Sequence, residues 1–150
     1  MKMFMTHLGK FRRLAWPEKW LLMQACGLLA FIVVALRLCS LATLQRLLFR
    51  LTDRSYAAFP ARRPPVVRIV WAIQAASCWL PLATCLPQAL AAHFMLTRYG
   101  YPAALQLGAA RTADGQVAAH AWVTSQNEIV IGRLSDLDRF MSLTPAERNA

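Results

Sequence analysis

One cysteine and one histidine are the side chains of this 150-residue chain whose types and spacing could do chemistry together. Cys85 stands where a helix is expected to begin, and His120 lies in a run with the alternation of a strand. The free N–H groups and the dipole of a helix N-terminus favour a thiolate there. An imidazole on a neighbouring sheet could take the thiol proton and later give it to a leaving amine, so the pair predicts nucleophilic catalysis.

The other two histidines are poorly placed to act on Cys85. His93 follows it by eight residues on the same predicted helix, which separates them by about 12 Å along the axis. His7 belongs to the basic N-terminal region. His120 is therefore the candidate base, and the alternative is that it is an ordinary hydrogen-bonded strand residue.

The cysteines and histidines do not predict a metal site, a cofactor or a disulfide framework. The four cysteines have no short-spaced pair, and a metal would need three or four ligands. In a chain of this size, that pattern predicts reduced thiols in the cytoplasm. Cys26, Cys39 and Cys78 are expected to be small apolar residues without a chemical role, and Cys85 could be another.

Composition predicts one apolar, strongly basic domain. Apolar residues make up 57% of the chain and charged residues 16%, with a net charge of +10. Much of the positive charge precedes Arg68, so an anionic lipid surface or an acidic peptide is the expected partner. Nucleic acid is not expected, because no reader motif is present and the basic residues are spread along apolar helices.

The sequence divides into a basic apolar helical region, 1–60, and a core region, 61–150. One long helix is expected over 17–51, and its section 20–36 contains Gln24 as the only strongly polar side chain. A membrane span needs about 20 apolar residues. Hydropathy alone does not separate a buried helix from a short span, so membrane association through 17–51 stays open.

The core region changes from helical to alternating periodicity, which predicts an α+β fold. Proline-rich residues 57–65 are expected to form a linker or sharp turn. The predicted elements are helices over 66–80 and 84–99, antiparallel strands over 103–109, 117–124 and 128–132, and a helical turn over 136–140.

Alternation places His120 and Trp122 on the same face of the middle strand. The helix that begins at Cys85 is expected to cover this face. Ala89 and Ala92 lie on one side of that helix, and their small side chains would allow a close approach to the strand.

Four segments resemble the leader peptidases of lasso-peptide biosynthesis, the transglutaminase-like B proteins that process microcin J25-type precursors. These segments are residues 85–92, 96–103, 107–108 and 119–123. The likeness extends back into the arginine- and leucine-rich helices and covers most of the chain. It implies a papain-like or transglutaminase-like arrangement of a nucleophile helix on a small antiparallel sheet.

The resemblance also implies an activity and partners. A cysteine protease of this kind removes the leader from a ribosomally made precursor, and an asparagine-synthetase-like cyclase then closes the ring. Cys85 matches the family's nucleophile and His120 its base. Split versions leave leader recognition to a separate small protein, and this chain resembles the peptidase half of such a pair.

One position departs from the family pattern. An acidic residue usually follows the histidine by about a dozen positions and orients the imidazole. Gly132 and Arg133 stand there instead. Asp136 is the first substitute and Asp138 the second, each with the alternative of being an exposed charge, and a backbone carbonyl or an asparagine could orient the ring instead.

Two further residues are candidates for substrate binding. Gln88 could donate to an oxyanion or could only pack, and Trp122 could line a substrate groove or belong to the core. Two other functions also fit the sequence. A non-catalytic membrane-associated scaffold would account for the basic apolar helix, and another transglutaminase-like acyl transferase would use the same cysteine.

Overall fold

The computed structural model describes residues 15–55 and 63–143, apart from the side chains of residues 53–55. Within these ranges, four helices precede a four-stranded antiparallel sheet, which confirms the α+β prediction. In chain order the elements are α2 (Trp16–Leu38), α3 (Leu41–Ser55), α4 (Val66–Ser77), α5 (Cys85–Arg98), β1 (Ala104–Arg111), β2 (Val117–Ser125), β3 (Glu128–Ile131), η1 (Leu137–Arg139) and β4 (Met141–Ser142).

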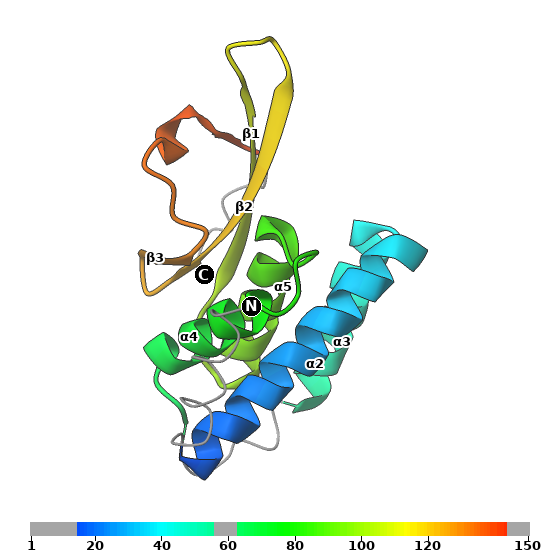
Figure 1. Cartoon of the computed structure of the whole chain (residues 1–150), viewed down its shortest axis with the longest axis vertical. Coiled ribbons are helices and arrows are strands. Elements are labelled where there is room, and N and C mark those ends of the chain that lie inside the picture. The colour runs from blue at the N-terminus through cyan, green and yellow to red at the C-terminus, as the bar shows by residue number, and fades with distance from the viewer. Residues whose placement is uncertain (1–14, 56–62, 144–150) are drawn as a thin grey trace, which may run out of the picture.

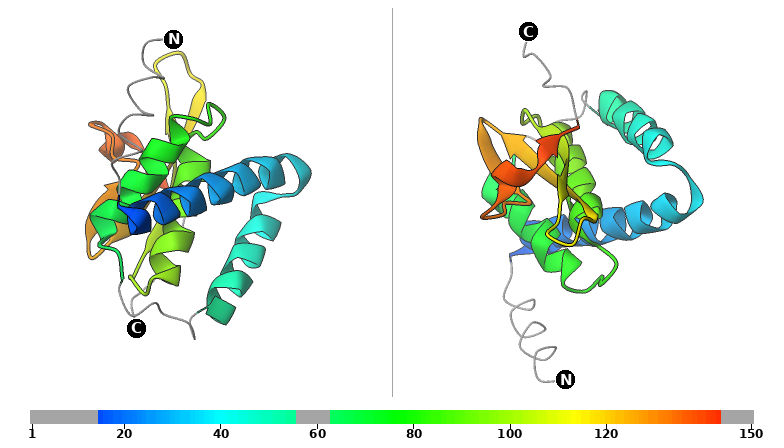
Figure 2. Two further views of the ribbon diagram at one scale, coloured as in Figure 1. Left: turned by 60° about the horizontal axis from the view of Figure 1, so that its bottom comes forward. Right: turned by 90° about the horizontal axis from the view of Figure 1, so that it is seen from above.

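The expectation of one helix over 17–51 is wrong, because the chain bends at Cys39 and Ser40. Cys39 adopts extended angles (φ −140°, ψ 166°). The Ser40 hydroxyl accepts a hydrogen bond from the Thr43 N–H at 3.3 Å and lies 2.9 Å from the Thr43 hydroxyl. Serine before a helix satisfies an otherwise unpaired N–H, which starts a second helix here. Figure 2 shows α2 running outward and α3 turning back toward the body of the protein.

The sheet has the strand order β3-β2-β1-β4. The predicted Asp114-Gly115 turn joins β1 to β2, and Gly115 has the positive φ of +78° that glycine tolerates. Gln126 and Asn127 join β2 to β3 with φ values of 51° and 65°, as in a tight two-residue hairpin. The two-residue strand β4 was not predicted, because so short a segment has no detectable alternation.

The connection from β3 to β4 crosses a face of the sheet. β3 and β4 lie at opposite edges, so residues 132–140 must pass over β2 and β1. In Figure 1 this segment lies on one side of β1 and β2, and α5 lies on the other. The sheet therefore has a helix face and a connection face.

The hydrophobic core lies between the helix face and α5. Ala89, Ala92 and Leu96 on α5 are fully buried, and Ala121 and Val123 on β2 belong to the same cluster. Buried residues of α2, α3 and α4 continue that cluster. Small side chains on α5 thus lie in the core between this helix and the sheet.

Candidate active site

Cys85 is the first residue of α5, directly after the turn that follows α4. Its thiol is free and half-buried. Thr84 occupies the N-cap position, but its hydroxyl does not cap the helix. In this first turn Pro87 has no N–H and the Gln88 N–H donates to Thr84, so the N–H groups of Cys85 and Leu86 are the ones available for a negative charge beside the sulfur. Trp79 and Leu82 expose apolar side chains in the preceding turn, and sequence reasoning had not identified them.

A backbone carbonyl holds the imidazole of His120. Nε2 of His120 lies 2.7 Å from the carbonyl oxygen of Gly132. A carbonyl can only accept a hydrogen bond, so Nε2 must carry the proton that it donates. In the neutral ring, Nδ1 then has the lone pair. Nδ1 is therefore the ring nitrogen that can act as a base.

Gly132 can reach this position because it has no side chain. Its φ is +80°, and an added Cβ would lie 2.6 Å from the Ala121 carbonyl oxygen and 2.9 Å from Trp122 Cα. Any larger residue would strain the backbone and collide with β2. The sequence signal for this arrangement is only a glycine directly after a strand.

Two aromatic rings fix the His120 side chain on the connection face. Trp122 stacks on the imidazole with ring centroids 6.2 Å apart and an interplanar angle of 17°. Phe140, at the end of the connection, lies 5.6 Å from the imidazole. Trp122 also covers Gly108, the β1 residue that pairs with His120. Trp122 is therefore buried by local packing, and Phe140 had not been predicted as part of the site.

The expectation that α5 covers His120 and Trp122 is wrong. Alternation places Ala121 and Val123 on the opposite face of β2, and these two residues join the core with α5. The physical reason is hydrophobicity: Ala121 and Val123, with Leu105 and Leu107 on β1, form the more continuous apolar face. Among the described residues, no hydrogen bond joins the Cys85 thiol to the His120 ring.

Residues 28–144 match the family model of the transglutaminase-like superfamily. The chain belongs to this superfamily. No curated protein and no solved structure matches the chain. The transglutaminase-like superfamily includes cysteine proteases and acyltransferases, and Cys85 and His120 both lie inside the matched residues.

The predicted third member of a transglutaminase-like triad is engaged elsewhere. The Asp136 carboxylate forms an ion pair with Arg139 at 3.1 Å, on the exposed surface. Asp138 lies in η1 and is exposed. His120 Nε2 instead donates its hydrogen bond to the Gly132 carbonyl oxygen.

Gln88 binds the turn that precedes α5. Its Nε2 donates to the Ala83 carbonyl oxygen at 2.7 Å, which ties α5 to that turn. The backbone N–H of Gln88 donates to the Thr84 carbonyl oxygen at 3.2 Å. The side-chain and backbone N–H groups of Gln88 thus hold the backbone next to Cys85 in place.

The remaining thiols of this transglutaminase-like chain lie on α2 or at the C-terminal ends of α2 and α4. Cys39 and Cys78 donate to carbonyl oxygens one turn back, Ala35 and Gln74. Burial raises the pKa of Cys26, which disfavours its thiolate. In the part of the chain that the structure describes, no three metal-binding side chains lie together.

Proposed function

We propose that this protein is a cysteine peptidase that removes the leader from a lasso-peptide precursor, with Cys85 as nucleophile and His120 as base. One observation carries the proposal: Cys85 begins the central helix of a transglutaminase-like fold. The motifs around Cys85 and His120 resemble the leader peptidases of this pathway. Water is then the final acyl acceptor.

The proposed chemistry needs a thiolate, a proton carrier and a place for an oxyanion. The sulfur of Cys85 attacks the carbonyl at the leader–core junction, and the Sγ–C bond forms as the carbonyl oxygen becomes negative. The first-turn N–H groups of α5 are the available donors to that oxygen. The imidazolium gives its proton to the leaving amine as the C–N bond breaks. Water, deprotonated by the same ring, hydrolyses the thioester.

The proposal requires the side chains of Cys85 and His120 to move closer together than they are in the described conformation. In the described conformation, the α5 helix that carries Cys85 packs on the helix face of the sheet and His120 lies on the connection face. Proton transfer therefore requires Nδ1 of His120 and Sγ of Cys85 to approach each other. Catalytic hydrogen bonds often tighten only when substrate binds. We propose that the separate leader-recognition protein, with the precursor, brings the two groups together. An asparagine-synthetase-like cyclase would then act on the product, in the cytoplasm.

Cleavage of a precursor by matched cysteine variants tests the proposal. Cys85→Ala and Cys78→Ala are each incubated with precursor and recognition protein, and leader release is followed by mass spectrometry. Cys78 is the control because it is exposed and lies in the turn before α5. Cys85→Ala is expected to lose cleavage. Cys78→Ala is expected to cleave at the wild-type rate. Equal cleavage by both would refute the proposal.

A disulfide trap tests the approach of the two side chains directly. His120→Cys is made in a protein whose other thiols are replaced, except Cys85. A disulfide requires Cβ atoms about 3.5–4.5 Å apart. The expected result is slow oxidation alone and rapid oxidation when precursor and recognition protein are added. No trapping in either condition would show that the pair does not meet.

The acyl-transferase alternative predicts a different product with the same cysteine. Hydrolysis leaves a free carboxylate, whereas transfer to an amine adds the mass of that amine. Adding a primary amine to the cleavage reaction separates the two, because our proposal expects the hydrolysed product to dominate.

A second candidate function, as a membrane-associated scaffold, is favoured by one stripe on α2. Trp16, Trp20, Met23, Val34 and Leu38 expose their apolar side chains at intervals of three, four and eleven residues, on one side of the helix. α2 is long and apolar enough to cross a membrane by length and composition. With a net charge of +10, the chain would also be attracted to anionic lipid.

Vesicle sedimentation tests this contact separately from catalysis. Vesicles of phosphatidylglycerol are compared with vesicles of phosphatidylcholine, using the wild type and a Trp20→Ser, Val34→Ser double variant. Membrane contact predicts sedimentation with the anionic vesicles that the double variant loses. A scaffold without chemistry also predicts that Cys85→Ala leaves every function of the protein intact.

A further inference from the structure

A cavity of about 590 Å³ lies at the far end of α5 from Cys85. It is bounded by the start of α2, residues 63–65, the start of α4 and the end of α5. The 14-residue helix α5 separates it from the cysteine by about 20 Å. Its volume is in the range of binding sites for small ligands or short peptide segments. Nothing in the peptidase chemistry uses it.

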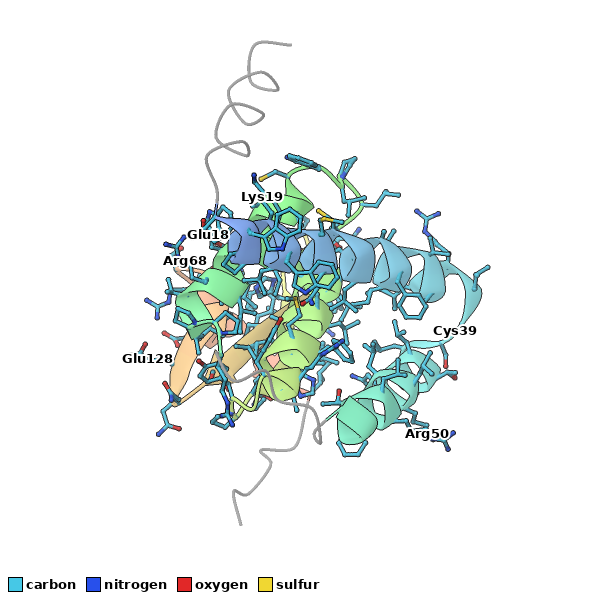
Figure 3. The ribbon with its side chains drawn as sticks, turned by 90° about the horizontal axis from the view of Figure 1, so that it is seen from below. Glu18, Lys19, Cys39, Arg50, Arg68 and Glu128 are labelled. Atoms are coloured by element: carbon cyan, nitrogen blue, oxygen red, sulfur yellow. The ribbon has the colours of Figure 1, made fainter. Side chains whose placement is uncertain are left out.

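Positive charge dominates the lining of the cavity. Arg63, Arg68 and Arg98 line it, and Glu18 is the one acidic side chain among the lining residues that the structure describes. Glu18 already forms an ion pair with Arg68 at 2.5 Å. Figure 3 shows these two side chains together where α2 and α4 begin. Among the described lining residues, the guanidinium groups therefore outnumber the carboxylates, and guanidinium groups suit carboxylates and phosphates.

Two helices also direct their N-termini toward this cavity. The N-cap residues of α2 and α4 are Ala15 and Pro65, and neither provides a side-chain cap. Both helix starts thus add partial positive charge. α5 ends here with the opposite polarity, and Arg98 in its last turn offsets that end.

Hydrogen bonds keep the walls of the cavity in place. The Tyr99 hydroxyl donates to Gln24 Oε1 at 2.8 Å, which ties the end of α5 to α2. The Tyr101 hydroxyl donates to the Pro64 carbonyl oxygen at 3.0 Å, which fixes the chain ahead of α4. Burial raises the pKa of Tyr99, so this hydroxyl stays protonated as a donor at neutral pH.

The rest of the lining is apolar. Trp20 and Leu21 of α2 contribute to the wall, together with Pro17, Pro64 and Pro65. A free inorganic anion would not use these surfaces. A peptide with an acidic side chain next to an apolar one would use both the guanidinium groups and the aromatic and proline walls.

We propose that this cavity binds an acidic, partly apolar peptide segment as a second site on the enzyme. This rests on the proposed function, in which the protein must hold a precursor and a recognition protein; either could supply the segment. The site would position the substrate complex while cleavage takes place at Cys85. The shared chemistry is a carboxylate flanked by an apolar side chain.

Binding of a defined probe tests the site without any catalysis. The probe is a fluorescein-labelled Glu-Leu-Glu-Phe-Glu amide, measured by anisotropy on the Cys85→Ala protein. The control probe has glutamine in place of each glutamate. Arg98→Gln should weaken binding of the acidic probe by about tenfold or more, because one charge-assisted interaction is lost. Arg111→Gln, at the exposed end of β1, is the matched control and should leave the affinity unchanged.

Specific outcomes would overturn the proposal. Equal binding of the glutamine probe, or equal weakening by Arg98→Gln and Arg111→Gln, would show non-specific attraction only. Binding of phenyl phosphate without binding of the peptide would reject the peptide assignment. If Arg98→Gln does not fold, Arg63→Gln gives the same test from another side of the cavity.

Two further measurements test the peptide-binding site separately from the peptidase activity and identify which protein supplies the segment. Competition by the isolated precursor or by the isolated recognition protein shows which of them displaces the probe. In the cleavage assay, Arg98→Gln should raise KM and leave kcat unchanged. Probe binding without any cleavage by the wild type would remove the peptidase and leave the cavity as a peptide-binding site.

Discussion

The two faces of the sheet differ in both cover and composition. The helix face carries Ala121 and Val123 and packs against α5 through apolar contacts. The connection face carries His120 and Trp122 and is covered by a segment that includes Gly132 and Phe140. Adjacent residues of one strand therefore belong to a stabilising core and to a polar site.

This difference indicates where stability and chemistry can be separated. Substitutions on the helix face should change the free energy of unfolding, because they remove buried apolar contacts. Substitutions on the connection face should change catalysis, because they alter the imidazole or the groups that hold it.

His120→Ala should have the largest effect, and this effect should be a loss of catalysis. Removing the proposed base should lower kcat/KM for leader removal by about 10²–10⁴-fold. The unfolding transition should change little, since the half-buried ring makes one hydrogen bond. Steady-state cleavage and thermal unfolding measured on the same sample provide the check. Full activity would show that His120 is not the base and that another group takes the thiol proton.

Val123→Ala should have the opposite effect, on stability. Val123 is fully buried on the helix face, three residues from His120 along the same strand. Loss of its buried side-chain atoms should lower the free energy of unfolding by about 2 kcal/mol. Denaturant unfolding measures this change. Cleavage by the folded fraction should stay at the wild-type rate, and a large loss of kcat would contradict the division between the faces.

Much of the fold followed from periodicity in the sequence. The strands and α5 were predicted because alternation and glycine or proline boundaries are local signals. The break between α2 and α3 was missed, although Ser40 and Thr43 carry a capping pattern, because the apolar run continues across it. The continuous hydropathy thus favoured one helix, although the Ser40–Thr43 capping pattern correctly indicated the start of a second.

The face of His120 could not be predicted in the same way. Alternation shows that His120 and Trp122 share a face, but it does not show which face a helix will cover. That choice depends on the combined apolar surface of Leu105, Leu107 and Val123, which come together only when the strands pair. The carbonyl that holds the imidazole is equally hidden, because a backbone group has no residue type to recognise.

Gly132→Ala should lower both the free energy of unfolding and the rate of cleavage, since Gly132 lies where the connection leaves β3. An added methyl group would meet the Ala121 carbonyl oxygen at 2.6 Å in a backbone with φ of +80°. The strain should lower stability by about 1–3 kcal/mol and displace the oxygen that binds Nε2. Alanine at Gly27, where an added Cβ has nothing within 4 Å, is the matched control and should not destabilise. Unchanged cleavage by Gly132→Ala would show that the carbonyl does not orient the ring.

Gly108→Ala should have the smallest effect, confined to the connection face. An added Cβ would lie 2.8 Å from the Trp122 ring and 3.0 Å from Phe140 Cβ, with ordinary backbone angles. Side chains can shift where backbone cannot, so we expect a loss of about 1 kcal/mol. The moved Trp122 ring would disturb its stacking on His120, and kcat should fall more than the stability does. Near-ultraviolet circular dichroism reports the tryptophan environment. If the spectrum changes and kcat does not, the stacked indole supports the packing of this face and has no role in holding the imidazole.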